Sequence, residues 1–145
     1  MATMLEGIQR RMQGEGSQAP VAELIGFRLV AISDGHATVE LEAGKRHANP
    51  MGTLHGGILC DIADAAMGMA YAATLDDSES FTTLELKINF LKPVWNAKLT
   101  AEANVVKNGR TVGLVQCDVF DERRSLVARA SSTCLTLRGK DAAGR

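Results

Sequence analysis

The chain has 145 residues, of which 46% are hydrophobic, and its formal net charge is −1. One ordinary domain with a packed core fits this length and composition. The near-neutral charge, without a basic run interleaved with aromatic residues, argues against nucleic acid or an anionic membrane as a partner. Cys60, Cys117 and Cys134 are scattered and form no CxxC pair, so we expect neither a disulfide framework nor a zinc site. Reduced thiols and the lack of a signal-peptide apolar core predict a cytoplasmic location.

The N-terminal part of the chain predicts two short helices separated by a flexible break. Residues 3–13 place apolar side chains at helical intervals. Residues 14–18 are polar and glycine-rich, which is typical of a break. Residues 19–25 predict a short helical turn, because Pro20 stands near its start and Gly26 follows its end.

Apart from one long helix, the rest of the chain predicts strands. Apolar and polar residues alternate in most of them, and Asp34-Gly35 and Asn108-Gly109 are strong signals for tight hairpin turns. After the long helix, one face of the next strand is expected to carry Leu84, Leu86, Ile88 and Phe90. The predicted strands are 27–33, 36–42, 81–91, 99–107, 110–120 and 126–137.

The long helix is predicted at residues 58–75, which are almost entirely small or apolar and rich in alanine, methionine and leucine. Only Asp61 and Asp64 interrupt the apolar run. Because the helix is apolar on every side, we expect it to be buried on every side. Its start falls at His55-Gly56-Gly57, where unpaired backbone N–H groups point out of the helix. The two aspartates and the many alanines argue against a membrane span.

This order of elements, without alternation of strands and helices, predicts an α+β fold with a largely antiparallel sheet. A single sheet covers only one side of a helix, so we expect a curled sheet and a second subunit to cover this one together. The domain is expected to span residues 19–138. A helical and flexible extension, 1–18, precedes it, and a disordered tail, 139–145, follows it.

The segment from Asn49 to Gly57, Asn-Pro-Met-Gly-Thr-Leu-His-Gly-Gly, followed by Asp64, resembles the hotdog-fold acyl-CoA thioesterases. It is most similar to the branch that contains phenylacetyl-CoA and 4-hydroxybenzoyl-CoA type thioesterases, and the resemblance covers residues 20–137. It implies a curled sheet wrapped around one long central helix, hydrolysis of an acyl-CoA to free acid and CoA, and no cofactor, since coenzyme A is part of the substrate. It also implies a homodimer whose sheets join edge to edge, with active sites between subunits. Many members pair such dimers into tetramers.

The glycines at the start of the long helix predict a site for a developing negative charge. A helix N-terminus supplies backbone N–H groups and a partial positive charge, which suit the oxyanion of thioester hydrolysis. Glycine lets a substrate approach this backbone closely, so Gly56 and Gly57 fit an oxyanion hole. The resemblance favours the N–H of Gly56. The residues alone leave open a loop that merely needs glycine conformations.

Asp64 is the main candidate for the reacting carboxylate. A buried Asp is usually paired or functional, and burial would raise its pKa toward neutrality, which suits a base or nucleophile. The resemblance makes it the general base or nucleophile, acting on a substrate held by the other subunit's oxyanion hole. Nine residues separate it from His55, which is roughly 13 Å along a helix. Asp61 ranks second, as a structural or hydrogen-bonding residue.

Three further polar residues are expected at the site. The resemblance implies that Asn49 orients a water or holds the thioester, although an Asn before Pro is more often a turn residue. Thr83 falls where related enzymes carry a Ser or Thr that helps to place the attacking water, and Thr82 would face the other way. His55 is expected to cap the helix or shape the loop. The spacing of the histidines predicts no metal site.

Substrate binding is expected to use surface cations and apolar side chains. Coenzyme A carries phosphates that favour Arg and Lys. Lys107 and Arg110, beside the second hairpin turn, and Lys92 are the expected phosphate contacts, although each also fits a solvated charge. The acyl pocket is expected to be lined by Leu54, Met67 and Met69.

Two other functions stay open at this level. One is a hotdog hydratase or dehydratase, which would need a different acid–base pair. The other is a domain that binds acyl-CoA without turning it over. Asp64 argues against the second, because a binder gains nothing from a costly buried carboxylate.

Overall fold

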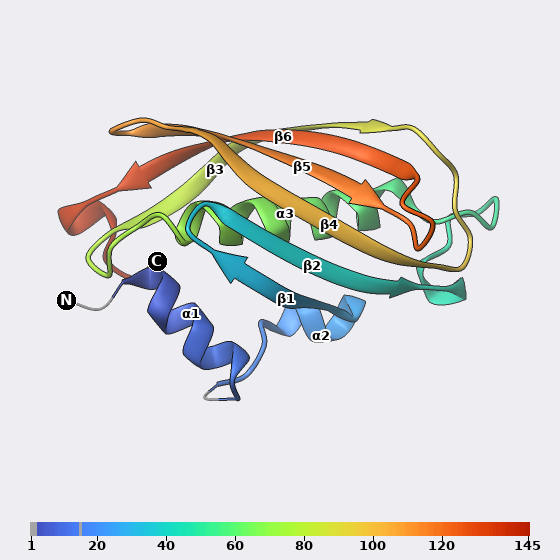
Figure 1. The fold of residues 1–145 in the computed structure, drawn as a ribbon, viewed down its shortest axis with the longest axis horizontal. Coiled ribbons are helices and arrows are strands. Elements are labelled where there is room, and N and C mark those ends of the chain that lie inside the picture. Colours follow the sequence, from blue (N-terminus) through green and yellow to red (C-terminus); the bar gives the residue numbers. More distant parts are fainter. Residues whose placement is uncertain (1–2, 15) are drawn as a thin grey trace.

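A six-stranded sheet curls around one long helix in the computed structural model, which describes residues 3–14 and 16–145 (Figure 1). The helices are α1 (Met4–Met12), α2 (Pro20–Ile25) and α3 (Gly56–Ala72), with short 3-10 helices at Lys45–His47 and Gly139–Asp141. The strands are β1 (Phe27–Ser33), β2 (His36–Ala43), β3 (Ser80–Phe90), β4 (Ala97–Asn108), β5 (Val112–Phe120) and β6 (Leu126–Leu137). Of the predicted extension 1–18, residues 1, 2 and 15 lie outside the described residues.

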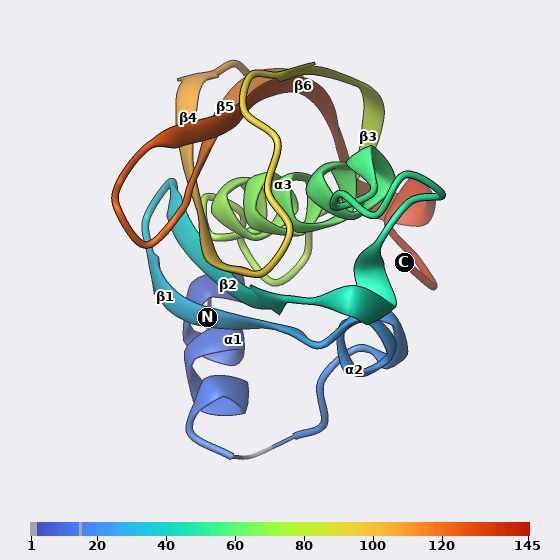
Figure 2. The same cartoon turned by 90° about the vertical axis from the view of Figure 1, so that its right-hand side faces the viewer.

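The strand order is β1-β2-β4-β5-β6-β3, and all neighbours are antiparallel. Strands β1 and β3 are therefore the two edges of an unclosed sheet. Viewed along α3, the sheet wraps around the helix from β1 to β3, and α1 and α2 lie beside β1 (Figure 2). The predicted α+β class and the curled antiparallel sheet around one central helix are confirmed.

The core lies between the concave side of the sheet and one face of α3. Alternation in the strands positions it: Ala37, Val39 and Leu41 of β2 are at most 3% exposed. At the C-terminal end of α3, the Tyr71 hydroxyl hydrogen-bonds to the Thr136 hydroxyl at 2.6 Å, and its ring packs edge-on against Phe81. Fully buried side chains of α3, β4 and β5 include Ile62, Ala66, Met67, Leu99, Ala101, Val115 and Val119.

The sheet of the same chain covers α3 on one side only, and burial of the other side stays a prediction that depends on a second subunit. Gly57 and Asp64 are exposed, and Asp61 is half-buried. These three residues recur at helical spacing on one side of α3, and we call them the open face. The sheet curls over the opposite side, so one chain alone leaves the open face uncovered.

Strand β3 contains a β-bulge, and because of it Leu84 does not lie on the predicted face of the strand. Thr83 pairs with Cys134 and Glu85 with Thr133, so the residue between them, Leu84, has no place in the ladder. Leu84 is 56% exposed and does not share the inward face of Leu86 and Ile88, which pack on the core. Alternation counted across the bulge was therefore wrong for Leu84.

The second hairpin is present, but its turn is longer than Asn108-Gly109 predicts. A two-residue turn of the favoured type needs a positive φ at both central residues. Gly109 does not adopt one, and its N–H donates to the Val112 carbonyl oxygen at 3.0 Å. Asn108 pairs with Gly113 instead, so β5 begins at Val112 and not at Arg110.

Within the described residues, no helix combines the length and apolarity needed to cross a membrane.

Candidate active site

A polar loop, residues 48–55, leads into α3 and is stabilised by hydrogen bonds between its own residues. The Asn49 side-chain amide donates to the Thr53 hydroxyl at 2.7 Å, and its carbonyl oxygen accepts from the Met51 N–H at 2.9 Å. Asn49 therefore serves as the turn residue that its position before Pro50 allows. Gly52 has φ 91°, a conformation that glycine adopts without strain.

His47 anchors the same loop to α2, a role that the sequence did not reveal. Its ring is 5% exposed, its Nε2 lies 2.7 Å from the Ile25 carbonyl oxygen, and its Nδ1 accepts from the Gly44 N–H at 3.1 Å. The His47 carbonyl oxygen then accepts from the His55 N–H at 2.9 Å. This chain of contacts sets where α3 begins.

His55 is the N-cap of α3, as predicted. Its Nδ1 accepts from the Gly57 N–H at 2.8 Å, and its carbonyl oxygen accepts from the Ile58 N–H at 3.0 Å. The N–H of Gly56 has no hydrogen-bond partner in the part of the chain that the structure describes. Gly56 thus presents a free donor at the positive end of the helix, the requirement for an oxyanion hole.

Space, and not backbone conformation, explains the two glycines. Neither Gly56 nor Gly57 has a positive φ, so the loop does not need glycine for its conformation. A Cβ on Gly57 would lie 2.8 Å from the capping Nδ1 of His55. A Cβ on Gly56 would lie 2.9 Å from Cζ of Phe90. Both positions therefore lie at a close approach between the helix and another group.

Asp64 lies on the open face, two turns into α3, without a cation. Although its side chain reaches the surface, the surrounding protein removes part of its water, and this partial burial raises its pKa. The negative charge of Asp61 raises the pKa of Asp64 further, and burial also raises the pKa of Asp61. No ion pair among the described residues involves either carboxylate. Fuller burial of Asp64 stays a prediction that depends on a second subunit, and the raised pKa agrees with the predicted direction.

Thr83 and Asp64 both lie near the Cys134 thiol. The Thr83 hydroxyl oxygen is 3.9 Å from Sγ of Cys134, which is fully buried. Burial raises the pKa of Cys134, and Asp64 is close enough for its negative charge to add to this rise. The structure therefore brings the predicted Thr83 to the same side of the sheet as Asp64. Cys134 was not predicted at the site, because nothing in its local sequence distinguishes it from a core residue.

The predicted substrate-binding residues are dispersed. Lys107 and Arg110 are exposed near the C-terminal end of α3, since Gly113 of the same hairpin lies against the Tyr71 ring. That end is roughly 22 Å from Gly56 along the helix. Leu54 and Met67 are 7% and 0% exposed and belong to the core, so these positions do not support a role as an acyl-pocket lining in the single chain. Met69 is half-buried.

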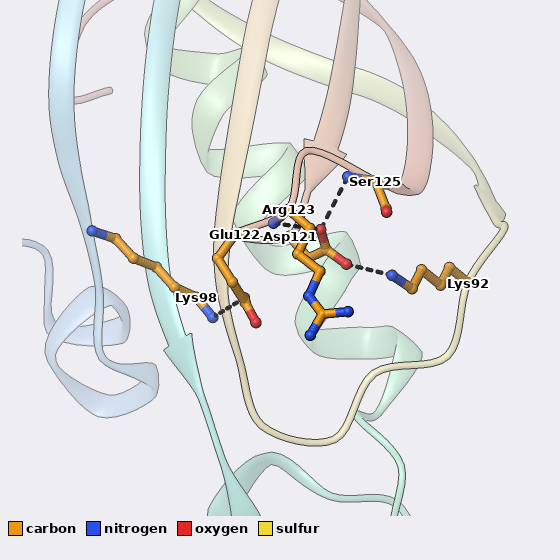
Figure 3. Close-up of polar contacts among 6 residues, drawn as sticks. All are labelled: Lys92, Lys98, Asp121, Glu122, Arg123 and Ser125. Carbon is orange, nitrogen blue, oxygen red and sulfur yellow. Dashed lines mark hydrogen bonds and ion pairs between the residues drawn. The ribbon is translucent and has the colours of Figure 1, made fainter.

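Lys92 is bound to a carboxylate and is not a free phosphate contact (Figure 3). Its Nζ lies 2.5 Å from Oδ2 of Asp121, a buried residue of the turn between β5 and β6. The other carboxylate oxygen of Asp121 accepts from the backbone N–H groups of Arg123 and Ser125, both at 3.0 Å. The hydrogen bond from Lys92 is the main reason that the pKa of Asp121 lies below its usual value. This constellation closes a turn.

No group of three or more His, Cys, Asp or Glu side chains within residues 3–14 and 16–145 is arranged to hold a metal ion.

Comparison with known proteins gives a consistent match. The family model "Thioesterase superfamily" matches residues 51–128, which is more than half of the chain and includes Gly56, Asp64 and Thr83. The chain is 32% identical over 120 residues to a protein of Saccharolobus solfataricus named as an esterase, SSO2140, covering 83% of this chain and 85% of that one. It is 28% identical to the 1,4-dihydroxy-2-naphthoyl-CoA hydrolase of Listeria monocytogenes, covering 77% and 90%.

A solved structure supports the same relationship. A phenylacetic acid degradation-related protein from Ralstonia eutropha JMP134 superposes with a TM-score of 0.80 at 31% identity, covering 88% of this chain and 97% of that one. The expected resemblance to the thioesterases is confirmed, including the branch related to phenylacetic acid degradation. With a family model over residues 51–128, relatives above 30% identity and a common fold, the chain belongs to the thioesterase superfamily.

Proposed function

We propose that this chain hydrolyses acyl-CoA thioesters to a free acid and CoA. The observation that carries the proposal is the pair of groups on α3: the free N–H of Gly56 at its start and the cation-free carboxylate of Asp64. The first suits an oxyanion, and the second suits a base or nucleophile. The relative named as a 1,4-dihydroxy-2-naphthoyl-CoA hydrolase acts on an aryl-CoA, which supports this substrate class.

In the proposed reaction the thioester carbonyl oxygen accepts a hydrogen bond from the Gly56 N–H. A carboxylate then does one of two things: it takes a proton from an attacking water, or it attacks the carbonyl carbon and is released by water in a second step. In either case the C–S bond breaks, the sulfur leaves as a thiolate that takes up a proton, and water supplies the oxygen of the acid. One backbone donor of this kind contributes about 3 kcal/mol to lowering the barrier.

Two chains are needed for this arrangement. Gly56 and Asp64 of one helix are roughly 12 Å apart, so they cannot both reach one carbonyl carbon and its oxygen. We propose a homodimer in which the partner subunit's Asp64 faces this Gly56. The uncovered open face of α3 and the edge position of β3 support the proposal, because edge strands carry unpaired backbone groups. A pairing of two such dimers into a tetramer is the larger assembly we expect.

Thr83 is the proposed partner of the attacking water, since it lies with Asp64 beside Cys134. His55 acts by capping α3 and so fixing the Gly56 peptide. A direct role for Asn49 would require its amide to leave Thr53, because both of its polar side-chain atoms are engaged within the loop. Lys107 and Arg110 lie toward the far end of α3, roughly 22 Å along the helix from Gly56 of their own chain, so a CoA phosphate contact there requires an extended CoA or the partner's site.

We propose a cytoplasmic location for this activity. The three cysteines are free, with Cys117 and Cys134 buried, which suits a compartment that keeps thiols reduced.

The test is an assay of the purified protein with a panel of aryl-CoAs and straight-chain acyl-CoAs, in which a thiol reagent detects released CoA. Asp64→Asn and Asp64→Ala are measured beside wild type. Asp77→Asn, in the exposed loop before β3, is the matched control because it removes the same charge from a position outside the site. Release of CoA that depends on Asp64 and not on Asp77 supports the proposal. No release from any substrate, or full activity in Asp64→Ala, contradicts it.

A further inference from the structure

The ring of Phe90 lies over the first residue of α3. Phe90 ends β3 on the inward side, in line with Leu86 and Ile88. Its Cζ, Cε1 and Cε2 atoms are 2.9, 3.1 and 3.4 Å from the place that a Cβ on Gly56 would take. The outer end of the ring therefore rests on Gly56, and the missing Cβ is what makes room for it.

Most of this ring is nevertheless uncovered. Phe90 is 56% exposed, although a Phe in contact with a helix end is usually buried. The contact with Gly56 is thus not part of the closed core. In the single chain it leaves an apolar surface at the end of the edge strand β3, beside the one N–H of the helix start that is unpaired among the described residues.

We propose that Phe90 is a positioning residue for the thioester: its ring walls one side of the Gly56 N–H and carries the group attached to the reacting carbonyl. The proposal rests on the proposed function and adds a residue that determines how the substrate meets the donor. Among residues 3–14 and 16–145 no group accepts a hydrogen bond from the Gly56 N–H, so in solution this N–H is open to water. An apolar wall displaces that water and lowers the local dielectric.

The physical consequence is larger in the transition state than in the ground state. A hydrogen bond to a developing oxyanion strengthens as water is excluded, because charge interactions grow when the dielectric falls. A neutral thioester carbonyl gains much less from the same exclusion. Loss of the ring should therefore lower kcat more than it raises KM.

A purely structural role makes a different prediction. If the ring only filled space beside Gly56, its truncation would lower the melting temperature and leave the kinetics of the folded protein unchanged. The contact would then resemble any large-to-small change at a half-buried site. The two roles are separated by measuring kcat, KM and the melting temperature on the same samples.

The experiment compares Phe90→Ala and Phe90→Leu with wild type and with Leu24→Ala, which truncates an exposed apolar side chain on α2 away from the site. The panel contains acyl-CoAs with increasing bulk next to the carbonyl. We expect kcat to fall on the order of tenfold in Phe90→Ala, KM to change less, Phe90→Leu to recover most of the rate, and Leu24→Ala to behave as wild type. Size-exclusion chromatography checks that the subunits still associate equally.

The outcomes distinguish the two proposals. An active wild type with equal kcat in Phe90→Ala overturns the role of Phe90 and leaves the thioesterase assignment intact. A fall in kcat that Phe90→Leu does not recover, with a changed oligomeric state, also overturns it, because the ring would then act through assembly. A wild type that hydrolyses no acyl-CoA overturns both.

Discussion

Asp64 on the open face of α3 and Asp121 in the turn between β5 and β6 are surrounded in opposite ways. Asp121 is buried, yet Lys92 and two backbone N–H groups bind its carboxylate, and its pKa is lowered. Asp64 reaches the surface, yet it has no cation and its pKa is raised by partial burial and by Asp61. The charged form is stabilised at one site and destabilised at the other.

The difference separates a structural carboxylate from a reactive one. A carboxylate with both oxygens engaged in hydrogen bonds is a weak base and cannot move toward a substrate. A carboxylate that is poorly solvated and unpaired holds a proton more tightly and has a free approach. If burial alone were used to choose the reactive carboxylate, Asp121 would be chosen wrongly, because the buried Asp121 is the inert one.

The largest expected effect is at Asp64. Asp64→Asn should lower kcat about 100-fold to 10,000-fold, because the base or nucleophile is lost while the shape stays. The melting temperature at pH 7 should rise, since a raised pKa means that the folded state loses stability as pH increases through that pKa. Steady-state kinetics and thermal unfolding on one sample test both statements. If Asp64→Asn kept the wild-type kcat and the wild-type pH dependence of the melting temperature, Asp64 would be a structural residue like Asp121.

Gly56 should give the next effect. Gly56→Ala places a Cβ where the outer end of the Phe90 ring now lies, so the ring must turn away and kcat should fall on the order of 100-fold. The double variant Gly56→Ala/Phe90→Ala removes this clash. If Gly56 serves the approach of the substrate, the double variant recovers the melting temperature of Phe90→Ala, but its kcat stays below that of Phe90→Ala. Equal kcat and melting temperature in the double variant and in Phe90→Ala would show that only the ring requires glycine there.

Asp61 should shift the pH profile without removing activity. Burial is the larger cause of the raised pKa of Asp64 and the charge of Asp61 is the smaller one, so Asp61→Asn removes only part of the rise. The acid limb of kcat/KM should move to lower pH and stay above the limb expected for an ordinary Asp. Other ionisable groups near this region are Cys60 on α3, Cys134 on β6 and Glu85 on β3. An unchanged limb would mean that Asp61 does not act on the reacting carboxylate.

The smallest effect on activity is expected at Asp121. Its lowered pKa contributes stability above the pKa of the unfolded chain, and this stability is lost as pH falls through the pKa of the folded state. Asp121→Asn should therefore lower the melting temperature at pH 7, and the difference from wild type should shrink in acid. Activity of the folded variant should match wild type. A large loss of kcat with an unchanged melting temperature would refute the structural assignment.

Local patterns in the sequence were sufficient for most elements and for the start of the site. Proline and glycine marked α2, alternation marked β2 and β4, and the glycines after His55 marked the N-terminus of α3. What failed depends on distant partners. The engagement of Lys92 by Asp121 and the lengthened turn at Gly109 both require knowledge of which segments meet in space.

The open face of α3 is the feature that the sequence predicted least well. The composition of residues 58–75 correctly indicated a helix that needs cover, but it did not indicate which side one chain leaves bare. The curl of the sheet decides that, because it determines which part of α3 contacts β2, β4 and β5. Desolvation was predicted to raise the pKa of Asp64 and is the main cause of the rise in the single chain, although that chain buries Asp64 only in part.

The bulge at Leu84 has a consequence for how this chain tolerates insertions and deletions. Phe81 and Thr83 face inward from odd positions, whereas Leu86 and Ile88 face inward from even ones. The extra residue changes the parity of the strand, so one β-strand delivers a hydroxyl to the site and apolar side chains to the core. Deleting Leu84 would restore strict alternation with Thr83, Leu86 and Ile88 all on the inward side, because Thr83 would then stand two positions before Leu86. The bulge is thus the place in β3 where the loss of one residue keeps both the hydroxyl and the apolar side chains on the inward side.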